Sequence, residues 1–467
     1  MSKIGVLKNR FHPSGWQNCD WTNRMKEAID TLQLELDFID SPSHIDDETL
    51  FYLTRLNHDA GHKNSEKLSK KLEDIALHFE NRRSSLFPSS YLYRLYENKK
   101  NIFFLFKNCG VKQPQTWFFN NIEDALSTEV PFPVVLKHPY SCASNFMEQA
   151  KNIKEYRDKI KKIFNVSSEC IVQQKIMFTR EARLTFVGDE VVHGYFRIKK
   201  DRDSLSGSTR FGSVCDFDIN LKEMSKHIKK FRKLTNINIG ACDVAWENDD
   251  LTVEPHFFEV SPIFSMNVPG PVGSAYKSFK GTAEFKIKER QIQLNFYKKV
   301  IQFLKQQSEK PVVYCDIDYT INDHTPRVKK WVNPDGSIDL RYGNYDEIML
   351  DPANKRAREV LNDAKEKYKI VFLTARGKFS NAYLSTRDWL IKNNFHYDQI
   401  LIVDNFEQKL DVLKSDYKTH LFIDDLTRGH HTDKIEVKKD NIKKLIYFNI
   451  PFIRYNNNWS EIEEALK

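Results

Sequence analysis

The stretch VVYCDIDYTIND, residues 312–323, places two carboxylates and a hydroxyl directly after an apolar run. Residues 312–315 have the composition of a short buried strand, and Asp316, Asp318 and Thr320 follow it. Ligands of parallel sheets bind beyond the carboxyl ends of the strands. The stretch therefore predicts an α/β domain with catalytic carboxylates at one edge of its sheet.

The sequence after residue 312 alternates between apolar strands and helical segments. Helices are expected near residues 353–367 and 380–394, and the expected strands are VVYCD, KIVFLTA, QILIVD, LFIDD and KLIYF. This βαβ alternation predicts a parallel, doubly wound sheet. Roughly 30 residues separate Asp318 from the first helix, and WVNPDGSIDLRY within them is expected to form a hairpin flap turning at Asp335–Gly336. The domain should therefore have a small cap or none.

Four polar signals accompany the strands of this region. They are the carboxylates Asp316 and Asp318, the hydroxyl of Thr374, the amine of Lys409 and the adjacent carboxylates Asp424 and Asp425. A parallel sheet would bring them to one edge, where together they supply the groups that phosphoryl transfer needs. One carboxylate can attack phosphorus, and a second can protonate the leaving oxygen and later activate water. The hydroxyl and the amine can hold phosphoryl oxygens, and a downstream carboxylate can complete a magnesium site.

This ordered set resembles the four motifs of the haloacid dehalogenase superfamily of phosphatases, over roughly residues 311–450. The resemblance implies a Mg²⁺-dependent phosphatase that works through an aspartyl phosphate. The roles that it implies are nucleophile for Asp316, general acid and base for Asp318, phosphate ligands for Thr374 and Lys409, and magnesium ligands for Asp316, Asp318 and Asp424 or Asp425.

A second set of charged residues lies between residues 99 and 267. Two strand pairs are predicted there, one turning at residues 188–189 and one near residues 248–250. The set comprises Lys99 at a helix start, Lys137 at a strand end, Arg183 and Arg197 on the first strand pair, and Asp243 and Glu259 on the second. Lysine and arginine suit the phosphates of a nucleoside triphosphate, and the acids suit magnesium.

The order and spacing of this set resemble the ATP-grasp superfamily, especially D-alanine–D-alanine ligases and amino-acid ligases that modify protein tails, over about residues 90–270. The resemblance implies that Lys99 and Lys137 bind ATP phosphates, that the adenine hinge is formed by Gln173, Gln174, Lys175 and Ile176, and that Asp243 and Glu259 bind magnesium. From their charge alone, Arg183 is expected to bind the nucleotide and Arg197 to act in catalysis.

Two features depart from the ATP-grasp pattern. The acidic strand of the family ends Glu-x-Asn, whereas Val260 and Ser261 follow Glu259 here, so Asn267 is expected to supply the missing oxygen ligand. The phosphate-covering loop of the family is rich in glycine, whereas HPYSCASN (138–145) has none. Both departures concern how ATP and its metal are held.

The length and composition suit a multidomain protein of mixed α/β and α+β class. The 467 residues divide into an ATP-grasp region over 1–305, a linker over 306–311 and a phosphatase domain over 312–467, with the first region split into subdomains 1–85 and 86–305. No apolar run reaches 18 residues, which predicts no membrane span. Seven scattered cysteines without a CxxC pair predict reduced thiols and a cytoplasmic protein.

The leading hypothesis is a bifunctional enzyme. The first region would activate a small-molecule carboxylate with ATP and Mg²⁺ and join it to an amine. If that amine carried a phosphate ester, the second domain would remove the phosphate afterwards, as would suit surface polysaccharide (capsule) or small-molecule biosynthesis.

Two other hypotheses remain open. LTAR with Thr386 and Trp389 downstream resembles polynucleotide 3′-phosphatases, and the net charge of +8 permits nucleic-acid end processing. The chain has neither a P-loop nor an aromatic–basic stripe, which disfavours that hypothesis. Arg376 of LTAR could equally be a surface arginine. The third hypothesis is that one half is a degenerate binding or regulatory module.

Overall fold

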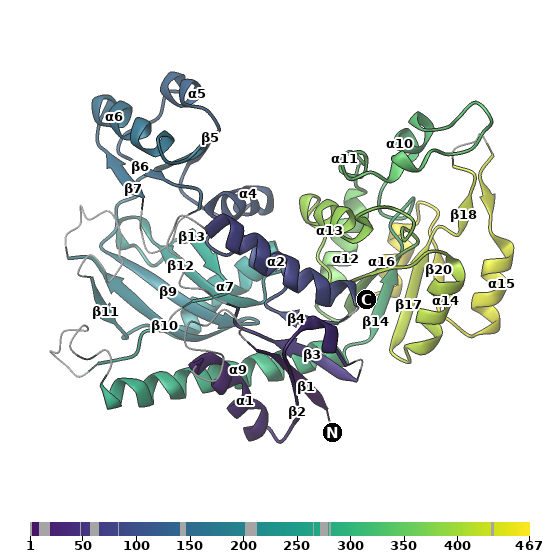
Figure 1. Cartoon of the computed structure of the whole chain (residues 1–467), viewed down its shortest axis with the longest axis horizontal. Coiled ribbons are helices and arrows are strands. Elements are labelled where there is room, and N and C mark those ends of the chain that lie inside the picture. Colours follow the sequence, from purple (N-terminus) through teal and green to yellow (C-terminus); the bar gives the residue numbers. More distant parts are fainter. Residues whose placement is uncertain are drawn as a thin grey trace. The chain divides into compact units, whose positions relative to one another are not determined.

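The computed structural model divides the chain into two compact units (Figure 1). An N-terminal unit comprises Met1–Phe79 and Ser84–Leu304, and a C-terminal unit comprises Glu80–Arg83 and Lys305–Lys467. The structure describes residues 2–8, 19–46, 48–56, 65–82, 84–140, 146–200, 213–264, 266–270, 279, 282–430 and 434–467. The expected mixed α/β, multidomain architecture with parallel sheets is confirmed. Most of the predicted phosphate-covering loop, residues 141–145, lies outside the described residues. None of the described helices combines the length and apolar character needed to span a membrane.

The N-terminal unit begins with a parallel sheet of four strands in the order β2-β1-β3-β4. The strands are β1 (Lys3–Leu7), β2 (Glu35–Ile39), β3 (Thr49–Leu53) and β4 (Leu86–Phe87). Ile4 and Val6 of β1 pack in one cluster with residues of α1 (Asp20–Thr31), and Leu7 packs in a second cluster with residues of α2 (Ser65–Asn81). Successive residues of a strand point to opposite faces, so helices cover both faces of this sheet.

A small antiparallel sheet of four strands follows, in the order β5-β8-β6-β7. The strands are β5 (Thr116–Phe119), β6 (Val134–Lys137), β7 (Met147–Ala150) and β8 (Cys170–Gln174). The helices α5 (Ile122–Ser127) and α6 (Ile153–Phe164) contribute Ala125, Tyr156 and Ile160 to its core. The helices α3 (Ser90–Leu95) and α4 (Lys99–Cys109) precede this sheet, and Gly110 ends α4 with φ of +69°, a conformation suited to glycine.

The largest sheet of the unit is antiparallel, in the order β11-β10-β9-β12-β13. Its strands are β9 (Arg180–Val187), β10 (Glu190–Ile198), β11 (Val214–Asp216), β12 (Ile239–Ala245) and β13 (His256–Ser261). Both predicted strand pairs, β9–β10 and β12–β13, are confirmed. One hydrophobic cluster joins this sheet to α4, α7 (Leu221–Thr235) and α9 (Ala283–Glu309). Because α9 continues to Glu309, most of the expected linker over 306–311 is helical.

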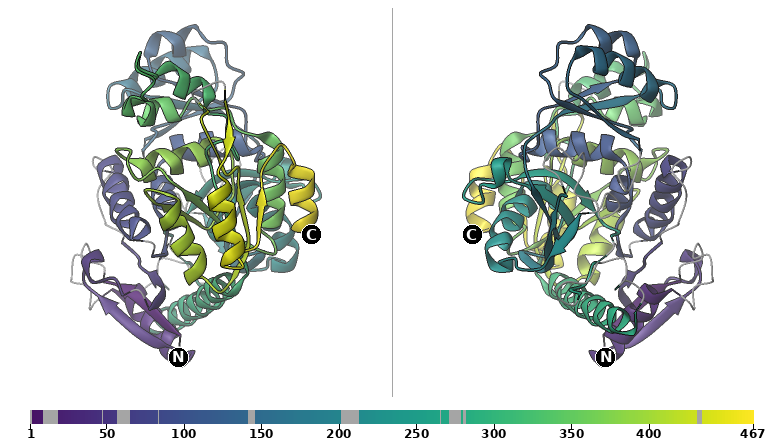
Figure 2. Two further views of the ribbon diagram at one scale, coloured as in Figure 1. Left: turned by 90° about the vertical axis from the view of Figure 1, so that its right-hand side faces the viewer. Right: turned by 90° about the vertical axis from the view of Figure 1, so that its left-hand side faces the viewer.

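The C-terminal unit is a parallel sheet of five strands between two layers of helices (Figures 1 and 2). Its order is β16-β15-β14-β17-β20, and the strands are β14 (Val312–Cys315), β15 (Lys369–Thr374), β16 (Gln399–Ile402), β17 (Thr419–Asp424) and β20 (Phe452–Arg454). Val313 and Cys315 pack with α12 (Lys355–Ala364), α13 (Ala382–Lys392) and α16 (Trp459–Ala465). Val312 and Tyr314 pack with α14 (Phe406–Ser415) and α15 (Lys439–Tyr447). The predicted doubly wound arrangement is present.

Three local predictions in this unit need correction. The roughly 30 residues after Asp318, expected to precede the first helix, contain the short helices α10 (Thr325–Lys330) and α11 (Tyr345–Ile348). KLIYF was predicted as a strand, but residues 444–447 belong to α15, and the last strand is β20. Leu445 is fully buried while Ile446 and Tyr447 are exposed, so the run buries one side of a helix and does not form a strand. The flap expected around Asp335–Gly336 does turn there, but only a single bridge, Val332↔Ile338, replaces the expected hairpin strands.

Candidate active sites

Three of the predicted phosphatase residues meet at the carboxyl edge of the C-terminal sheet. Asp316 follows β14, Asp424 ends β17, and Lys409 lies on α14, which Asn405 caps through its side chain. The Nζ atom of Lys409 lies 2.8 Å from Oδ1 of Asp316 and 2.8 Å from Oδ2 of Asp424. Asp425 belongs to the same cluster, because carboxylate oxygens of Asp316, Asp424 and Asp425 lie within 4.8 Å of one another. The parallel topology thus brings residues more than 100 positions apart in the sequence to one point.

The electrostatics of this cluster favour a further cation. Burial raises the pKa of Asp316 to about 7; the ammonium of Lys409 opposes this rise, and the carboxylates of Asp424 and Asp318 add to it. Burial opposes the charge of Lys409, but Asp316 and Asp424 hold its pKa above the ordinary value. Three buried carboxylates, two of which contact Lys409, form an oxygen-rich donor set, which is the set that Mg²⁺ prefers. The residues present therefore fit a magnesium ion.

Two threonines lie at the same edge of the sheet. Thr374 ends β15, is 1% exposed, and its Oγ1 has no hydrogen-bond partner among the described residues. Oγ1 of Thr320 accepts a hydrogen bond from the backbone N–H of Asp425 at 3.1 Å. Thr320 thus fixes the turn that carries Asp425, whereas Thr374 makes no such side-chain hydrogen bond to another described residue.

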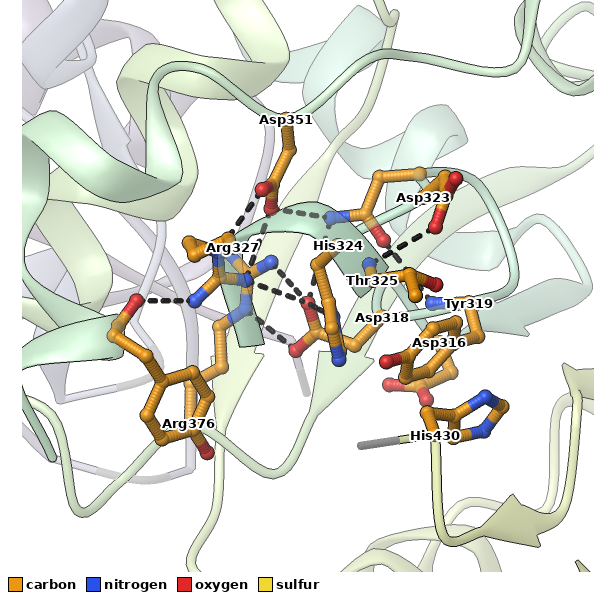
Figure 3. A network of polar contacts seen from close by, with 12 residues as sticks. Asp316, Asp318, Tyr319, Asp323, His324, Thr325, Arg327, Asp351, Arg376 and His430 are labelled. Carbon is orange, nitrogen blue, oxygen red and sulfur yellow. Dashed lines mark hydrogen bonds and ion pairs between the residues drawn. The ribbon is translucent and has the colours of Figure 1, made fainter. Parts of the chain in front are cut away.

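Asp318 lies in a different environment from Asp316 (Figure 3). Nε and Nη2 of Arg376 donate to the two carboxylate oxygens of Asp318 at 2.8 and 2.6 Å. Nδ1 of His324 lies 2.7 Å from Oδ1. Burial would raise the pKa of Asp318, but Arg376 and His324 outweigh burial and hold it well below the ordinary carboxyl value. Arg376 is fully buried, so its interpretation as a surface arginine is wrong.

The structure adds residues that the sequence motifs did not identify. Arg327, on α10 (Thr325–Lys330), donates from Nε and Nη2 to both oxygens of Asp351 at 2.9 Å and lies 3.5 Å from Asp318. The ligand atoms of Asp318, His324 and Asp351 are close enough to share a metal ion, but Arg327 already supplies a cation there. Arg327 and Asp351 flank the segment predicted as a flap, where charged residues are expected at the surface. Only their burial in the structure identifies them as part of the site.

Tyr319 and His430 form an aromatic pair next to Asp318. Their ring centroids are 3.2 Å apart and nearly parallel, and His324 lies 3.8 Å from the Tyr319 ring on centroids. Tyr319 has φ of +62°, a left-handed conformation that costs energy for a residue with a side chain. Backbone strain of this kind is frequent at functional sites. Here the strained backbone conformation places the Tyr319 ring beside the carboxylates.

The predicted ATP-binding residues of the N-terminal unit form a charged row across its largest sheet. Arg183 on β9, Asp243 on β12 and Glu259 on β13 are direct neighbours in register. Nε of Arg183 lies 2.6 Å from Oδ1 of Asp243, and Nη2 of Arg197 lies 2.7 Å from the same oxygen. Nη2 of Arg197 also lies 2.8 Å from Glu181. Side chains at i and i+2 share one face of a strand, so Glu181 could have been found from Arg183.

The two predicted phosphate lysines are electrostatic neighbours. Asn98 caps the helix that Lys99 begins, and the N–H of Lys99 donates to the carbonyl of Pro139 at 2.8 Å. Burial lowers the pKa of Lys137 to about 8; Lys99 adds to this effect, while Glu259 and Glu181 oppose it. Lys137 thus lies near both a second cation and a predicted metal ligand, as a polyphosphate site requires.

The predicted adenine hinge runs from β8 into the residues after it. Oε1 of Gln173 accepts from Nζ of Lys137 at 2.5 Å, and its Nε2 donates to Thr116 at 2.9 Å. The remaining hinge residues differ in environment: Gln174 is exposed, Lys175 donates to Gln149 at 3.0 Å, and Ile176 is buried with Phe178 and Ala245.

The predicted magnesium ligands of this unit form an incomplete set. Within the described residues, both groups of three side chains able to share a metal ion lie in the C-terminal unit. Both oxygens of Asp243 contact arginines, and Ser261 donates to the carbonyl of Ile263. Nδ2 of Asn267 donates to Sγ of Cys215 at 3.2 Å. If Asp243 and Glu259 bind a metal, they supply only two carboxylates, and the phosphate oxygens of a nucleotide would have to complete the coordination.

Comparisons with known proteins give distant structural similarity. No protein-family model matches the chain. No curated protein matches it either. A RimK domain protein ATP-grasp from Sphaerobacter thermophilus DSM 20745 is 13% identical with a TM-score of 0.41, over 65% of this chain and 100% of that one. D-alanine–D-alanine ligase from Bacillus anthracis is 13% identical with a TM-score of 0.41, over 66% and 97%. A Chryseobacterium gregarium RiPP-associated ATP-grasp ligase, in complex with ADP and a leader and core peptide, is 16% identical with a TM-score of 0.40, over 63% and 96%.

Proposed function

We propose that the chain is a bifunctional enzyme, an ATP-dependent carboxylate–amine ligase of the ATP-grasp type joined to a Mg²⁺-dependent phosphatase of the haloacid dehalogenase type. The observation that carries the phosphatase half is the bridge of Lys409 between Asp316 and Asp424, at the sheet edge where the hydroxyl of Thr374 has no hydrogen-bond partner among the described residues. The ligase half is supported by the row Arg183–Asp243–Glu259 and by the neighbouring Lys99 and Lys137.

The ligase reaction would proceed in two steps. A carboxylate oxygen of the substrate attacks the γ-phosphorus of ATP, and the bond to the β-phosphate oxygen breaks to release ADP. An amine then attacks the carbonyl carbon of the acyl phosphate, and phosphate leaves as the amide forms. Lys99, Lys137, Arg183 and Arg197 would bind the phosphate oxygens, because arginine and lysine match that charge. Magnesium bound by Asp243 and Glu259 would neutralise the polyphosphate.

The phosphatase reaction would use Asp316 as nucleophile. Its carboxylate oxygen attacks phosphorus, the ester P–O bond breaks, and the leaving alkoxide oxygen takes a proton. Nδ1 of His324 lies 2.7 Å from Oδ1 of Asp318, so this pair would supply that proton through the imidazole, which the Asp318 carboxylate orients, and would later accept one from water. Thr374 and Lys409 would hold the phosphoryl oxygens, and magnesium bound by Asp316, Asp424 and Asp425 would offset their charge.

The two activities are connected if the amine substrate carries a phosphate ester. The ligase would then make a phosphorylated amide, and the phosphatase would hydrolyse its ester to leave an alcohol. Joining the two activities in one chain is useful when one makes the substrate of the other. Such a sequence would suit the amide decoration of a sugar acid in surface polysaccharide or small-molecule biosynthesis.

Nucleic-acid end processing is a second candidate function. Arg376 of LTAR and Thr386 on the helix that follows are in contact, since Nη1 of Arg376 donates to Oγ1 of Thr386 at 3.0 Å. Arg376 is buried and bound to Asp318, so its charge is paired inside the site and is not exposed to a nucleic-acid strand.

ATP consumption tests the proposed function and separates these candidates. ADP release would be measured with pools of small carboxylates and amines, with nucleic acid, and with neither. We expect ADP release only with carboxylate–amine pairs. Stimulation by nucleic acid alone would favour end processing, and no stimulation by any compound would favour a degenerate module.

Thr374→Val is expected to lower the kcat/KM of phosphate release about 100-fold, the usual loss for one donor to a developing oxyanion. Valine keeps the shape of threonine, and the hydroxyl has no partner among the described residues, so the free energy of unfolding should not fall. The measurements are hydrolysis of a generic phosphate monoester and thermal unfolding. An unchanged kcat/KM would remove Thr374 from the phosphate site.

A further inference from the structure

Arg55 is a buried cation in the N-terminal unit that the proposed reactions do not use. It follows β3 by two residues and is 7% exposed. Its Nη2 donates to the carbonyl of Phe264 at 2.7 Å, and its guanidinium lies 3.7 Å from the ring centre of Trp21. These contacts fix the guanidinium between the first sheet and the segment that follows β13.

No carboxylate in the described residues pairs with Arg55. Its neighbours are Tyr297, to which it hydrogen-bonds through the side chain, and Tyr96, Cys19 and Tyr93; burial lowers its pKa. Nε is buried and has no hydrogen-bond partner among the described residues. Buried charges in proteins are normally paired, because an unpaired charge in the interior costs on the order of several kcal/mol. The fold therefore retains a cost that an anionic ligand would remove.

A second feature at the same place also points to an anion. Trp21 belongs to the first turn of α1, whose N-cap residue, Cys19, makes no side-chain cap hydrogen bond. The acid of this turn, Asp20, is exposed. Thr22 is 1% exposed, and its Oγ1 has no partner among the described residues. The first turn of a helix presents free N–H groups and a partial positive charge, which favour anions.

We propose that Arg55, the hydroxyl of Thr22 and the N-terminus of α1 form a subsite for an oxyanion, either a carboxylate or a phosphate group. The subsite lies past the carboxyl end of β3 in a parallel sheet, where ligands of such sheets bind. Phe264, the carbonyl partner of Arg55, is five residues after the predicted metal ligand Glu259. The anion would then be a group of the ligase substrate, and this identity rests on the proposed function.

Binding of simple anions tests the subsite without ATP. The full chain would be titrated with inorganic phosphate and with acetate at constant ionic strength, and the rise in Tm would be followed. We expect a saturable rise for at least one anion in the wild type. Arg55→Met should abolish the rise with acetate and lower the rise with phosphate, which the proposed phosphate sites also bind. Arg24→Met, which removes an arginine paired with Glu27 on the same helix, should retain both.

Thr22→Val keeps the test decisive if Arg55→Met does not fold. Valine is isosteric and removes only a hydroxyl without a partner among the described residues, so the variant should fold and bind the anion about tenfold more weakly. Equal binding by Thr22→Val and the wild type, or no saturable binding by the wild type, overturns the subsite. This result would leave the ligase proposal intact, because ADP release is measured separately.

Steady-state kinetics of the ligase reaction identify which substrate supplies the anion. If the subsite holds the carboxylate of the acid, Thr22→Val raises the KM of the acid and leaves that of the phosphorylated amine unchanged. The reverse pattern assigns the phosphate of the amine. Unchanged KM values for both, together with weakened anion binding, would overturn the assignment to the ligase substrate.

Discussion

Asp316→Asn is expected to lower phosphate release from a monoester about 10⁴-fold or more, while ATP-dependent ligation continues at the wild-type rate. The amide cannot attack phosphorus, but it keeps the size of the carboxylate and can still accept a hydrogen bond from Lys409. Asp316 belongs to the C-terminal unit, and the predicted ATP ligands belong to the N-terminal unit. The two activities should therefore respond independently.

The stability of this variant gives an internal control. Burial raises the pKa of Asp316 to about 7, so the ionised form is disfavoured in the metal-free fold. Such a group lowers stability as pH rises from the ordinary carboxyl pKa through 7. Asparagine removes this charge and with it this pH dependence, so the fall in Tm between pH 5 and pH 8 in chelator should be smaller for Asp316→Asn than for the wild type. Asp411→Asn, an exposed position on α14, should change neither activity nor stability. Loss of ADP production in folded Asp316→Asn would contradict independent sites.

Glu259→Gln is expected to lower ligation about 10³-fold or more and to leave phosphatase activity unchanged. Glutamine keeps the shape of glutamate but loses the charge that would hold magnesium against the β- and γ-phosphates. Glu259 lies beside Asp243 in register, and Asp243 is already neutralised by Arg183 and Arg197. Of these two carboxylates, Glu259 is therefore the one whose charge the two arginines do not neutralise.

The matched control for Glu259→Gln is Glu254→Gln. Glu254 lies just before β13 and pairs with Lys230 at the surface, so its loss should change ligation by less than about twofold. ADP release with a competent carboxylate–amine pair is the readout for both variants. Ligation at the wild-type rate in Glu259→Gln would show that this residue does not bind the metal and that FFEVSP has another role.

The site residues that could be predicted from the sequence are those that end strands. The alternation of strands and helices after residue 312 is strong, and the carboxyl ends of parallel strands must meet, so Asp316 and Asp424 could be placed together from their positions alone. Lys409 is less obvious, because it comes from a helix. Its place follows from the capping Asn405, which begins α14 at the same edge.

The residues that sequence reasoning missed are held by contacts across long separations. Arg327 meets Asp351 across a segment that reads as a polar flap, and no periodicity marks either residue. Arg55 is a single charge after a strand, and only its burial distinguishes it from a surface arginine. KLIYF failed for a different reason, since short apolar runs fit a strand or one side of a helix equally well.

The ratio of phosphate to ADP released from one substrate pair tests the coupling of the two activities most directly. Ligation releases one phosphate for each ADP, and hydrolysis of the ester on the amide product releases a second. With ATP, a carboxylate and a phosphorylated amine, the wild type should yield about two phosphates per ADP, and Asp316→Asn should yield about one. A ratio of about one in the wild type, or release of ester phosphate without ADP, would contradict a phosphatase that acts on the product of the ligase.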